Sequence, residues 1–114
     1  MIELVSLENS SLTTFQKKVL ELTKKIPKGK VATYGLLAQV LGNINLSRAV
    51  GNALHKNPFP IIIPCHRVIQ GNGFIGGFAK GIEAKIKLLK EENISIKNNV
   101  IDLNQYLVDE IELK

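Results

Sequence analysis

The segment 57–69, with the sequence NPFPIIIPCHRVI, constrains this chain more than any other part of it. The segment contains three of the four prolines and the only cysteine, Cys65, which His66 follows directly. Proline fixes its own φ and favours an extended conformation in the residue before it. We therefore expect a stiff, extended and largely buried segment that ends at Cys65. A thiol held beside an imidazole suits nucleophilic chemistry, but a lone cysteine is more often a small buried hydrophobic residue, so both interpretations stay open here.

The composition indicates one globular domain with a modest core. Of the 114 residues, 45% are hydrophobic and 22% are charged. No apolar run approaches the ~18 residues of a membrane span, and the N-terminus lacks the pattern of a signal peptide. One cysteine cannot form an internal disulfide and argues against a structural zinc site. We expect a cytoplasmic, monomeric protein without membrane contact, cofactor or metal.

The charge is divided unevenly along the chain. Residues 1–90 contain 13 Lys/Arg and four Asp/Glu, a net charge of +9, whereas residues 91–114 contain two and six, a net charge of −4. A basic body of this kind suggests a polyanionic partner, with nucleic acid as the first candidate. A solvated lysine surface without a partner would explain the same charge.

The first part of the chain is expected to be a short arm, 1–12, followed by a helix. Thr13 and Gln16 have the spacing of a capping box, in which each side chain accepts from the other residue's backbone. Apolar residues then recur at helical spacing until a turn that begins at Pro27.

Two more short helices are predicted before the proline-rich segment. Thr33 is a suitable cap for the first of them, which stops near Gly42. Either Asn45 or Ser47 is expected to cap the other, which runs to about Lys56. Two helices joined by a tight turn form a candidate helix-turn-helix, although many such pairs bind nothing.

Beyond Cys65 the pattern changes from helices to turns and then back. Glycines predict tight turns at 70–73 and at 76–77, and apolar spacing predicts a fourth helix that ends near Glu92. Residues 94–102 resemble a small hairpin with an Asn-rich turn, and the last dozen residues a short packed element. The expectation is a single domain over 1–114, mainly α with minor β, with the hairpin and tail in 94–114.

Four motifs in combination identify a family. They are IPKGKV from Ile26, YGLLA from Tyr34, SRAVGNAL from Ser47, and the segment NPFPIIIPCHRVI. On these motifs, over about residues 14–92, the chain resembles the C-terminal, active-site domain of the O6-alkylguanine-DNA alkyltransferases, or methylated-DNA–protein-cysteine methyltransferases. The resemblance implies a winged helix-turn-helix-like fold and DNA repair by irreversible, single-turnover alkyl transfer from O6 of guanine. The implied partner is double-stranded DNA containing O6-alkylguanine, so a prokaryotic protein would be nucleoid-associated.

The resemblance also implies roles for three catalytic residues. Cys65 matches the alkyl acceptor, and His66 matches the base that deprotonates it through a water molecule. Glu92 matches the carboxylate that orients this histidine. Spacing alone does not link Glu92 to His66, and the adjacent Glu91 is the obvious misassignment.

The resemblance further implies that the helix-turn-helix enters the minor groove and extrudes the damaged base. Arg48 matches the side chain that fills the vacated space in the base stack, with Ser47 beside it at the DNA. Tyr34 matches the tyrosine that helps to turn the nucleotide out. A surface cation and a half-buried aromatic residue are the simpler interpretations of Arg48 and Tyr34.

Supporting residues follow from the same match. Asn57 matches the asparagine that ties the recognition segment to the active-site turn, and Lys85 a lysine that lines the pocket or supports its loop. An exposed helical lysine is the alternative for Lys85. Arg67 is expected to serve the fold or to contact a phosphate.

Two departures from the family pattern stand out. Many members have a tyrosine followed by serine or arginine in the pocket loop, where this chain has Phe78 and Ala79, which can wall the base but cannot donate a hydroxyl to O6. Full-length members often carry an N-terminal α/β domain, sometimes with zinc, in place of the arm 1–12.

The main alternative function is that of a non-catalytic alkyltransferase-like protein that binds damaged DNA and recruits other repair, a class that usually lacks the cysteine. A cysteine hydrolase is a further alternative without supporting motifs.

Overall fold

The computed structural model describes residues 13–56, 62–76 and 81–113, so the expected arm 1–12 lies outside the described residues. Most of the described residues that form regular structure are helical. The elements follow in the order α1 (Thr14–Thr23), β1 (Ala32–Thr33), α2 (Tyr34–Val40), the 3-10 turn η2 (Ile44–Leu46), α3 (Ser47–His55), the 3-10 turn η3 (Cys65–Arg67), β2 (Val68–Ile69), α4 (Ile82–Glu91), α5 (Leu103–Tyr106) and α6 (Glu110–Leu113). The prediction of a mainly α fold with minor β structure is confirmed.

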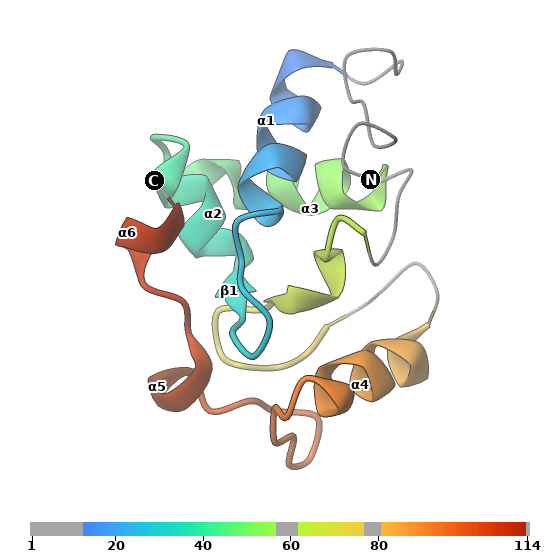
Figure 1. Ribbon diagram of the computed structural model, residues 1–114. Coiled ribbons are helices and arrows are strands. Elements are labelled where there is room, and N and C mark those ends of the chain that lie inside the picture. Colours follow the sequence, from blue (N-terminus) through green and yellow to red (C-terminus); the bar gives the residue numbers. More distant parts are fainter. Residues whose placement is uncertain (1–12, 57–61, 77–80, 114) are drawn as a thin grey trace.

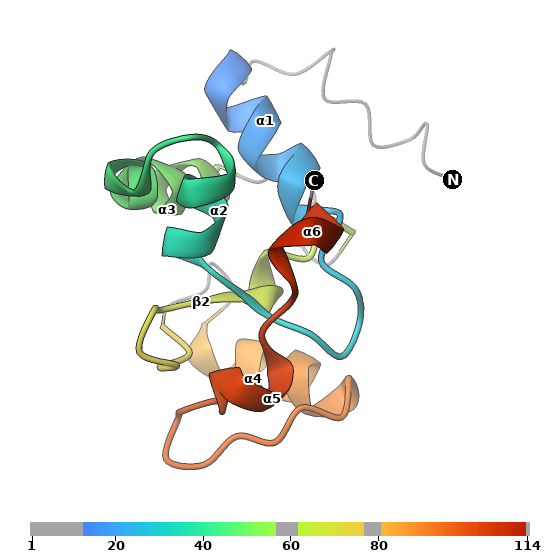
Figure 2. The same cartoon turned by 90° about the vertical axis from the view of Figure 1, so that its left-hand side faces the viewer.

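The short parallel pair β1–β2 lies between two groups of helices. Helices α1, α2 and α3 lie on one side of it, and α4 and α5 lie on the other (Figures 1 and 2). Ala32 pairs with Val68, and Thr33 with Ile69. Successive strand residues face opposite ways, so Ala32 and Val68 join one apolar cluster whereas Ile69 joins the other. The larger cluster is built on α1, α2 and α3, and the smaller one contains residues of α4 and α5.

Helix α1 begins with the capping box that the sequence predicts. The backbone N–H of Thr13 donates to Gln16 Oε1 at 2.9 Å, and the N–H of Gln16 donates to Thr13 Oγ1 at 3.1 Å. The helix ends at Thr23, earlier than the predicted end near Pro27. Turn-type hydrogen bonds, such as Ile26 N–H to the Thr23 carbonyl at 3.1 Å, take over between the two positions.

The predicted pair of helices before the proline-rich segment is present as α2 and α3. Thr33 caps α2, because its Oγ1 accepts the backbone N–H three residues on, at 3.0 Å. The expected caps of α3 are wrong. Asn43 Oδ1 accepts from the N–H of Asn45 at 2.9 Å and so starts the turn η2, which leads into α3 without a side-chain cap. The hydroxyl of Ser47 donates backwards to the Ile44 carbonyl at 2.8 Å.

The predicted hairpin in 94–102 is correct in its turn and wrong in its strands. Asn98 and Asn99 adopt left-handed φ values of 53° and 61°, and Lys97 and Val100 exchange two backbone hydrogen bonds of 3.0 Å. Asparagine tolerates this conformation better than most residues, which suits it to a two-residue hairpin turn. Pairing stops after this single bridge in the described chain, and residues 94–96 form no strand.

The chain after the hairpin turn pairs instead with the glycine turn near residue 73. The N–H of Ile101 donates to the Gly73 carbonyl at 2.8 Å, and the N–H of Ile75 donates to the Asn99 carbonyl at 3.0 Å. Gly73 has φ of +90°, and a Cβ at this position would lie 2.6 Å from the Ile101 carbonyl oxygen. Glycine is therefore required for this close approach.

The tail packs along the body as predicted. The N–H of Val31 donates to the Tyr106 carbonyl at 2.9 Å, and the N–H of Val108 donates to the Val31 carbonyl at 2.8 Å, beside β1. Leu113 in α6 is fully buried, whereas Ile111 is 78% exposed. Within the described ranges, no helix has the length and apolar character needed to cross a membrane.

Candidate active site

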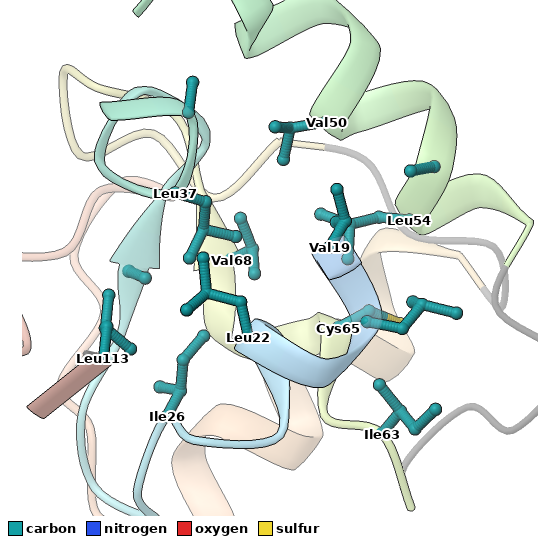
Figure 3. Close-up of a cluster of buried hydrophobic side chains, with 14 of the residues drawn as sticks. Val19, Leu22, Ile26, Leu37, Val50, Leu54, Ile63, Cys65, Val68 and Leu113 are labelled. Carbon is teal, nitrogen blue, oxygen red and sulfur yellow. The ribbon is translucent and has the colours of Figure 1, made fainter. Parts of the chain in front are cut away.

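Cys65 begins the turn η3 and lies in the interior. Its N–H donates to the Ile63 carbonyl at 2.7 Å across Pro64, whose φ of −79° and ψ of 64° are those of an inverse γ-turn. The proline ring fixes this φ, so Pro64 sets the direction in which the cysteine leaves the turn. The expected extended conformation is therefore wrong for Pro64, the residue immediately before Cys65. Figure 3 shows the Cys65 side chain within the larger apolar cluster, together with side chains of α1 and α3.

His66 is paired with Glu92, although 26 positions separate them. His66 Nε2 lies 2.8 Å from Glu92 Oε2, and the side chains are 2% and 9% exposed. An ionised carboxylate only accepts hydrogen bonds, so Nε2 carries the proton and the lone pair of a neutral imidazole is on Nδ1. The geometry thus selects Glu92, not the exposed Glu91.

Arg67 completes this network, and sequence reasoning missed its link to Glu92. Its Nε donates to Glu92 Oε1 and its Nη2 donates to Glu92 Oε2, both at 2.9 Å, while Nη1 donates to the Ile26 carbonyl at 2.8 Å. Glu92 is the C-cap of α4 and Ile26 follows α1, so Arg67 joins both helices to η3. A planar guanidinium suits this two-pronged contact with a carboxylate. No spacing in the sequence indicates it.

The protonation states follow from burial and from these neighbours. Burial by itself raises the pKa of Glu92, but hydrogen bonds and charge from Arg67 and His66 outweigh this effect and lower it. Burial has the largest effect on the pKa of His66 and lowers it. The hydrogen bond and charge of Glu92 oppose this effect, and the charges of Arg67 and Lys85 add smaller lowering effects, so the pKa is lowered overall. The pair therefore consists of a carboxylate and a neutral imidazole at neutral pH.

Lys85 is fully buried, so the alternative of an exposed helical lysine is wrong. Its Nζ donates to the Val68 carbonyl at 2.8 Å, which ties α4 to the residue that follows η3. Burial lowers the pKa of the Lys85 amine from 10.5 to about 8, and the Cys65 charge opposes this shift. Among the described residues, no group of three or more His, Cys, Asp or Glu side chains could hold a metal ion.

Tyr34 lies at the start of α2 and packs against α3. A Cβ on Gly51 would lie at the ordinary van der Waals distance of 3.9 Å from two atoms of the Tyr34 ring, so the ring lies next to Gly51 of α3. Burial raises the pKa of the Tyr34 hydroxyl, and the charge of Cys65 adds to this effect. Tyr34 and Lys85 therefore both lie within electrostatic reach of Cys65.

The other two residues predicted to contact DNA, Ser47 and Arg48, lie at the start of α3. Arg48 is exposed, whereas Ser47 is half-buried and its hydroxyl is engaged with Ile44. The structure thus separates a solvent-facing cation from the buried group around Cys65. Asn57 and Phe78 lie outside the described residues.

Residues 14–94 match the family model described as the 6-O-methylguanine DNA methyltransferase, DNA binding domain. The chain belongs to this family. It is 51% identical over 80 residues to the methylated-DNA–protein-cysteine methyltransferase of Methanosarcina acetivorans, a match that covers 70% of this chain and 51% of the relative. The match to the same protein of Kluyveromyces lactis is 50% identical and covers 70% of this chain and 42% of the relative. The chain thus spans about half the length of these curated relatives.

Two solved structures of DNA complexes resemble the fold. Mycobacterium tuberculosis OGT in complex with DNA superposes with a TM-score of 0.70 and 41% identity, covering 72% of this chain and 50% of that one. S. pombe Atl1, in complex with damaged DNA containing O6-carboxymethylguanine, superposes with a TM-score of 0.75 and 30% identity, covering 88% of this chain and 99% of that one. The prediction of the alkyltransferase helix-turn-helix-like fold is confirmed.

Proposed function

We propose that this protein repairs double-stranded DNA by transferring an alkyl group from O6 of guanine irreversibly to its own Cys65. The observation that carries the proposal is the buried contact of 2.8 Å between His66 Nε2 and Glu92 Oε2, directly after Cys65 in a chain of this family. This contact prepares a base beside a thiol, which is what a cysteine nucleophile requires. The proposal assigns no role to a metal or cofactor.

The first step is removal of the thiol proton. A free thiol has a pKa near ~8.5 and is mostly protonated at neutral pH. The lone pair on His66 Nδ1 takes the proton through a water molecule, while Nε2–H remains bonded to Glu92. The carboxylate stabilises the imidazolium that forms, and Arg67 keeps the carboxylate in position.

The second step is displacement at the alkyl carbon. The thiolate of Cys65 forms a C–S bond while the C–O6 bond breaks, and the electron pair leaves with guanine. Guanine takes up one proton, which replaces the proton that the thiol lost. The thioether is stable, so each molecule of protein reacts once.

The damaged base must leave the duplex before either step, because Cys65 is buried. Extrusion costs a few kcal/mol of stacking and pairing. We assign Arg48, exposed at the start of α3, to filling the gap in the base stack, with Ser47 beside it and Tyr34 turning the nucleotide toward the site. Asn57, Lys85 and Phe78 support the pocket in this proposal. The protein would act where the chromosomal DNA is, which in a prokaryotic cell would be the nucleoid within the cytoplasm.

A second candidate function is binding of alkylated DNA without transfer. The likeness to S. pombe Atl1, which extends over 99% of that chain, favours it, since the relatives named methyltransferases are matched over about half their length. The alkyltransferase-like class usually lacks the cysteine, whereas this chain has Cys65 next to a paired His66 and Glu92. We therefore favour transfer.

Intact-mass spectrometry separates the two functions. The protein is incubated with a duplex that contains one O6-methylguanine, and we expect a gain of one methyl group per molecule, located on Cys65 by peptide mapping. Cys65→Ser should show no gain and should bind the duplex about as tightly as the wild type. Tight binding by the wild-type protein without any gain in mass would contradict transfer and leave the binding function.

A further inference from the structure

Arg67 holds Glu92 more completely than a single ion pair would. Both carboxylate oxygens accept from the guanidinium, and Oε2 also contacts His66 Nε2. The third nitrogen of the guanidinium is fixed by the Ile26 carbonyl at 2.8 Å. The carboxylate therefore has a defined plane and position relative to the imidazole.

Without a nearby cation, the position of Glu92 would be unfavourable for a negatively charged side chain. It is the C-cap of α4, where the helix dipole presents partial negative charge, and its side chain is 9% exposed. A cation in bidentate contact offsets both effects. Arg67, whose side chain is 16% exposed, is the residue that supplies it.

A Glu92 carboxylate without a paired cation would also make His66 unable to act as a base. A lone negative charge beside an imidazole favours its protonated form, which cannot accept a proton from Cys65. The charged groups that act on His66 are Glu92 from the end of α4, Arg67 from η3 and Lys85 from α4. The first favours the imidazolium, and the other two oppose it.

We propose that Arg67 is a positioning residue, which fixes the Glu92 carboxylate and balances its charge so that His66 stays a neutral base at physiological pH. This inference rests on the proposed function. It adds a residue with no contact to the substrate, acting through Glu92 on the proton that leaves Cys65.

Two variants separate charge from structure. Arg67→Gln keeps amide donors but removes the charge, whereas Arg67→Lys keeps the charge but loses the two-pronged contact. The rate of benzyl transfer from free O6-benzylguanine is measured by intact mass, so that DNA binding does not affect it. The measurements run from about pH 5 to about pH 8, a range that includes the usual histidine pKa. We expect Arg67→Gln to move the acid limb of the profile upward by about one pH unit, which lowers the rate on that limb about tenfold. Arg67→Lys should move it by less than about half as much.

The control variant is Lys87→Gln, which removes a positive charge from the exposed face of α4 and should leave the profile unchanged. A fall in rate by the same factor at every pH in both Arg67 variants, with no movement of the acid limb, would show a merely structural role and overturn the inference. If the wild-type protein accepts no benzyl group, the proposed function fails instead.

A readout that needs neither activity nor variants of Arg67 is the NMR titration of His66. The chain has two histidines, and His55→Gln assigns the signals. We expect the His66 imidazole of the wild type to be neutral at pH 7 and to titrate below the usual range for histidine. An imidazole that is protonated at pH 7 would overturn the inference even if Arg67→Gln does not fold.

Discussion

Helix α3 and the η3–α4 region carry out their proposed tasks under opposite physical conditions. Arg48 in α3 is exposed, and its charge is available to a partner. His66 and Lys85 are buried and hydrogen-bonded to groups of the protein. In the proposed function, presentation of DNA therefore depends on surface charge, whereas the chemistry depends on a buried network of hydrogen-bonded side chains. Substitutions in the two regions should differ in kind as well as in size.

Cys65 lies at the boundary of the two regions. Its side chain belongs to the apolar cluster of α1 and α3, while its neighbour His66 is bonded to the end of α4. The turn η3 is thus supported from both sides, by packing on one and by hydrogen bonds on the other. Damage to the hydrogen-bonded side should slow the reaction with any substrate, including a free base.

Glu92→Gln should have the largest effect of a single polar substitution in the buried network. The amide cannot accept from Arg67 and His66 as a carboxylate does, and it leaves the guanidinium without its counter-charge. We expect the rate of benzyl transfer from free O6-benzylguanine to fall about 100-fold, since a positioned base typically contributes a factor of this order or more.

Glu91→Gln is the matched control, because Glu91 precedes Glu92 and is exposed. Its rate should stay within a factor of about two of the wild type, as expected for a surface substitution. An equal loss in both variants would contradict the assignment of Glu92 and the distinction between the buried and exposed regions.

Lys85→Met should change how stability depends on pH. The pKa of Lys85 falls from 10.5 in the unfolded chain to about 8 in the folded protein, so both states hold the proton below pH 8. Between these values the unfolded chain binds the proton that the folded protein has lost, and unfolding becomes less favourable as pH rises. In denaturant titrations at about pH 8 and about pH 10, the unfolding free energy of the wild type should therefore rise by about 2 kcal/mol more than that of Lys85→Met.

Lys87→Met provides the control, because Lys87 lies two residues further on the same helix and is exposed. The difference in unfolding free energy between the wild type and Lys87→Met should not vary over this range. A Lys85→Met difference that is equally flat would mean that the buried amine keeps an ordinary pKa.

Local signals in the sequence predicted the helices well. Thr13 with Gln16 and Thr33 are caps whose partners lie three residues away, so neighbouring residues contain the whole interaction. The predicted cap of α3 was wrong because the turn η2 precedes the helix, and its cap is Asn43. The predicted hairpin strands were wrong because the backbone of residues 99–101 pairs with the distant segment near Gly73.

The candidate site could be predicted only in part. Cys65 and His66 are adjacent in the sequence, but Glu92 came from the family resemblance alone. The contacts of Arg67 with Glu92 and Ile26 span 25 and 41 positions, and no periodicity encodes them. The burial of Lys85 likewise depends on how α4 packs on η3 and β2, which a helical pattern does not specify.

The most direct test of the central claim compares Arg48→Ala and Glu92→Gln on two substrates, a duplex with O6-methylguanine and free O6-benzylguanine. Single-turnover rates from intact mass give the ratio of duplex to free-base reactivity for each protein. Arg48→Ala should lower this ratio about tenfold or more, because loss of the inserted side chain penalises only extrusion of the base. Glu92→Gln should slow both substrates by the same factor and leave the ratio unchanged. A ratio that is unchanged in Arg48→Ala, or one that falls equally in both variants, would contradict the division between presentation by α3 and chemistry by η3 and α4.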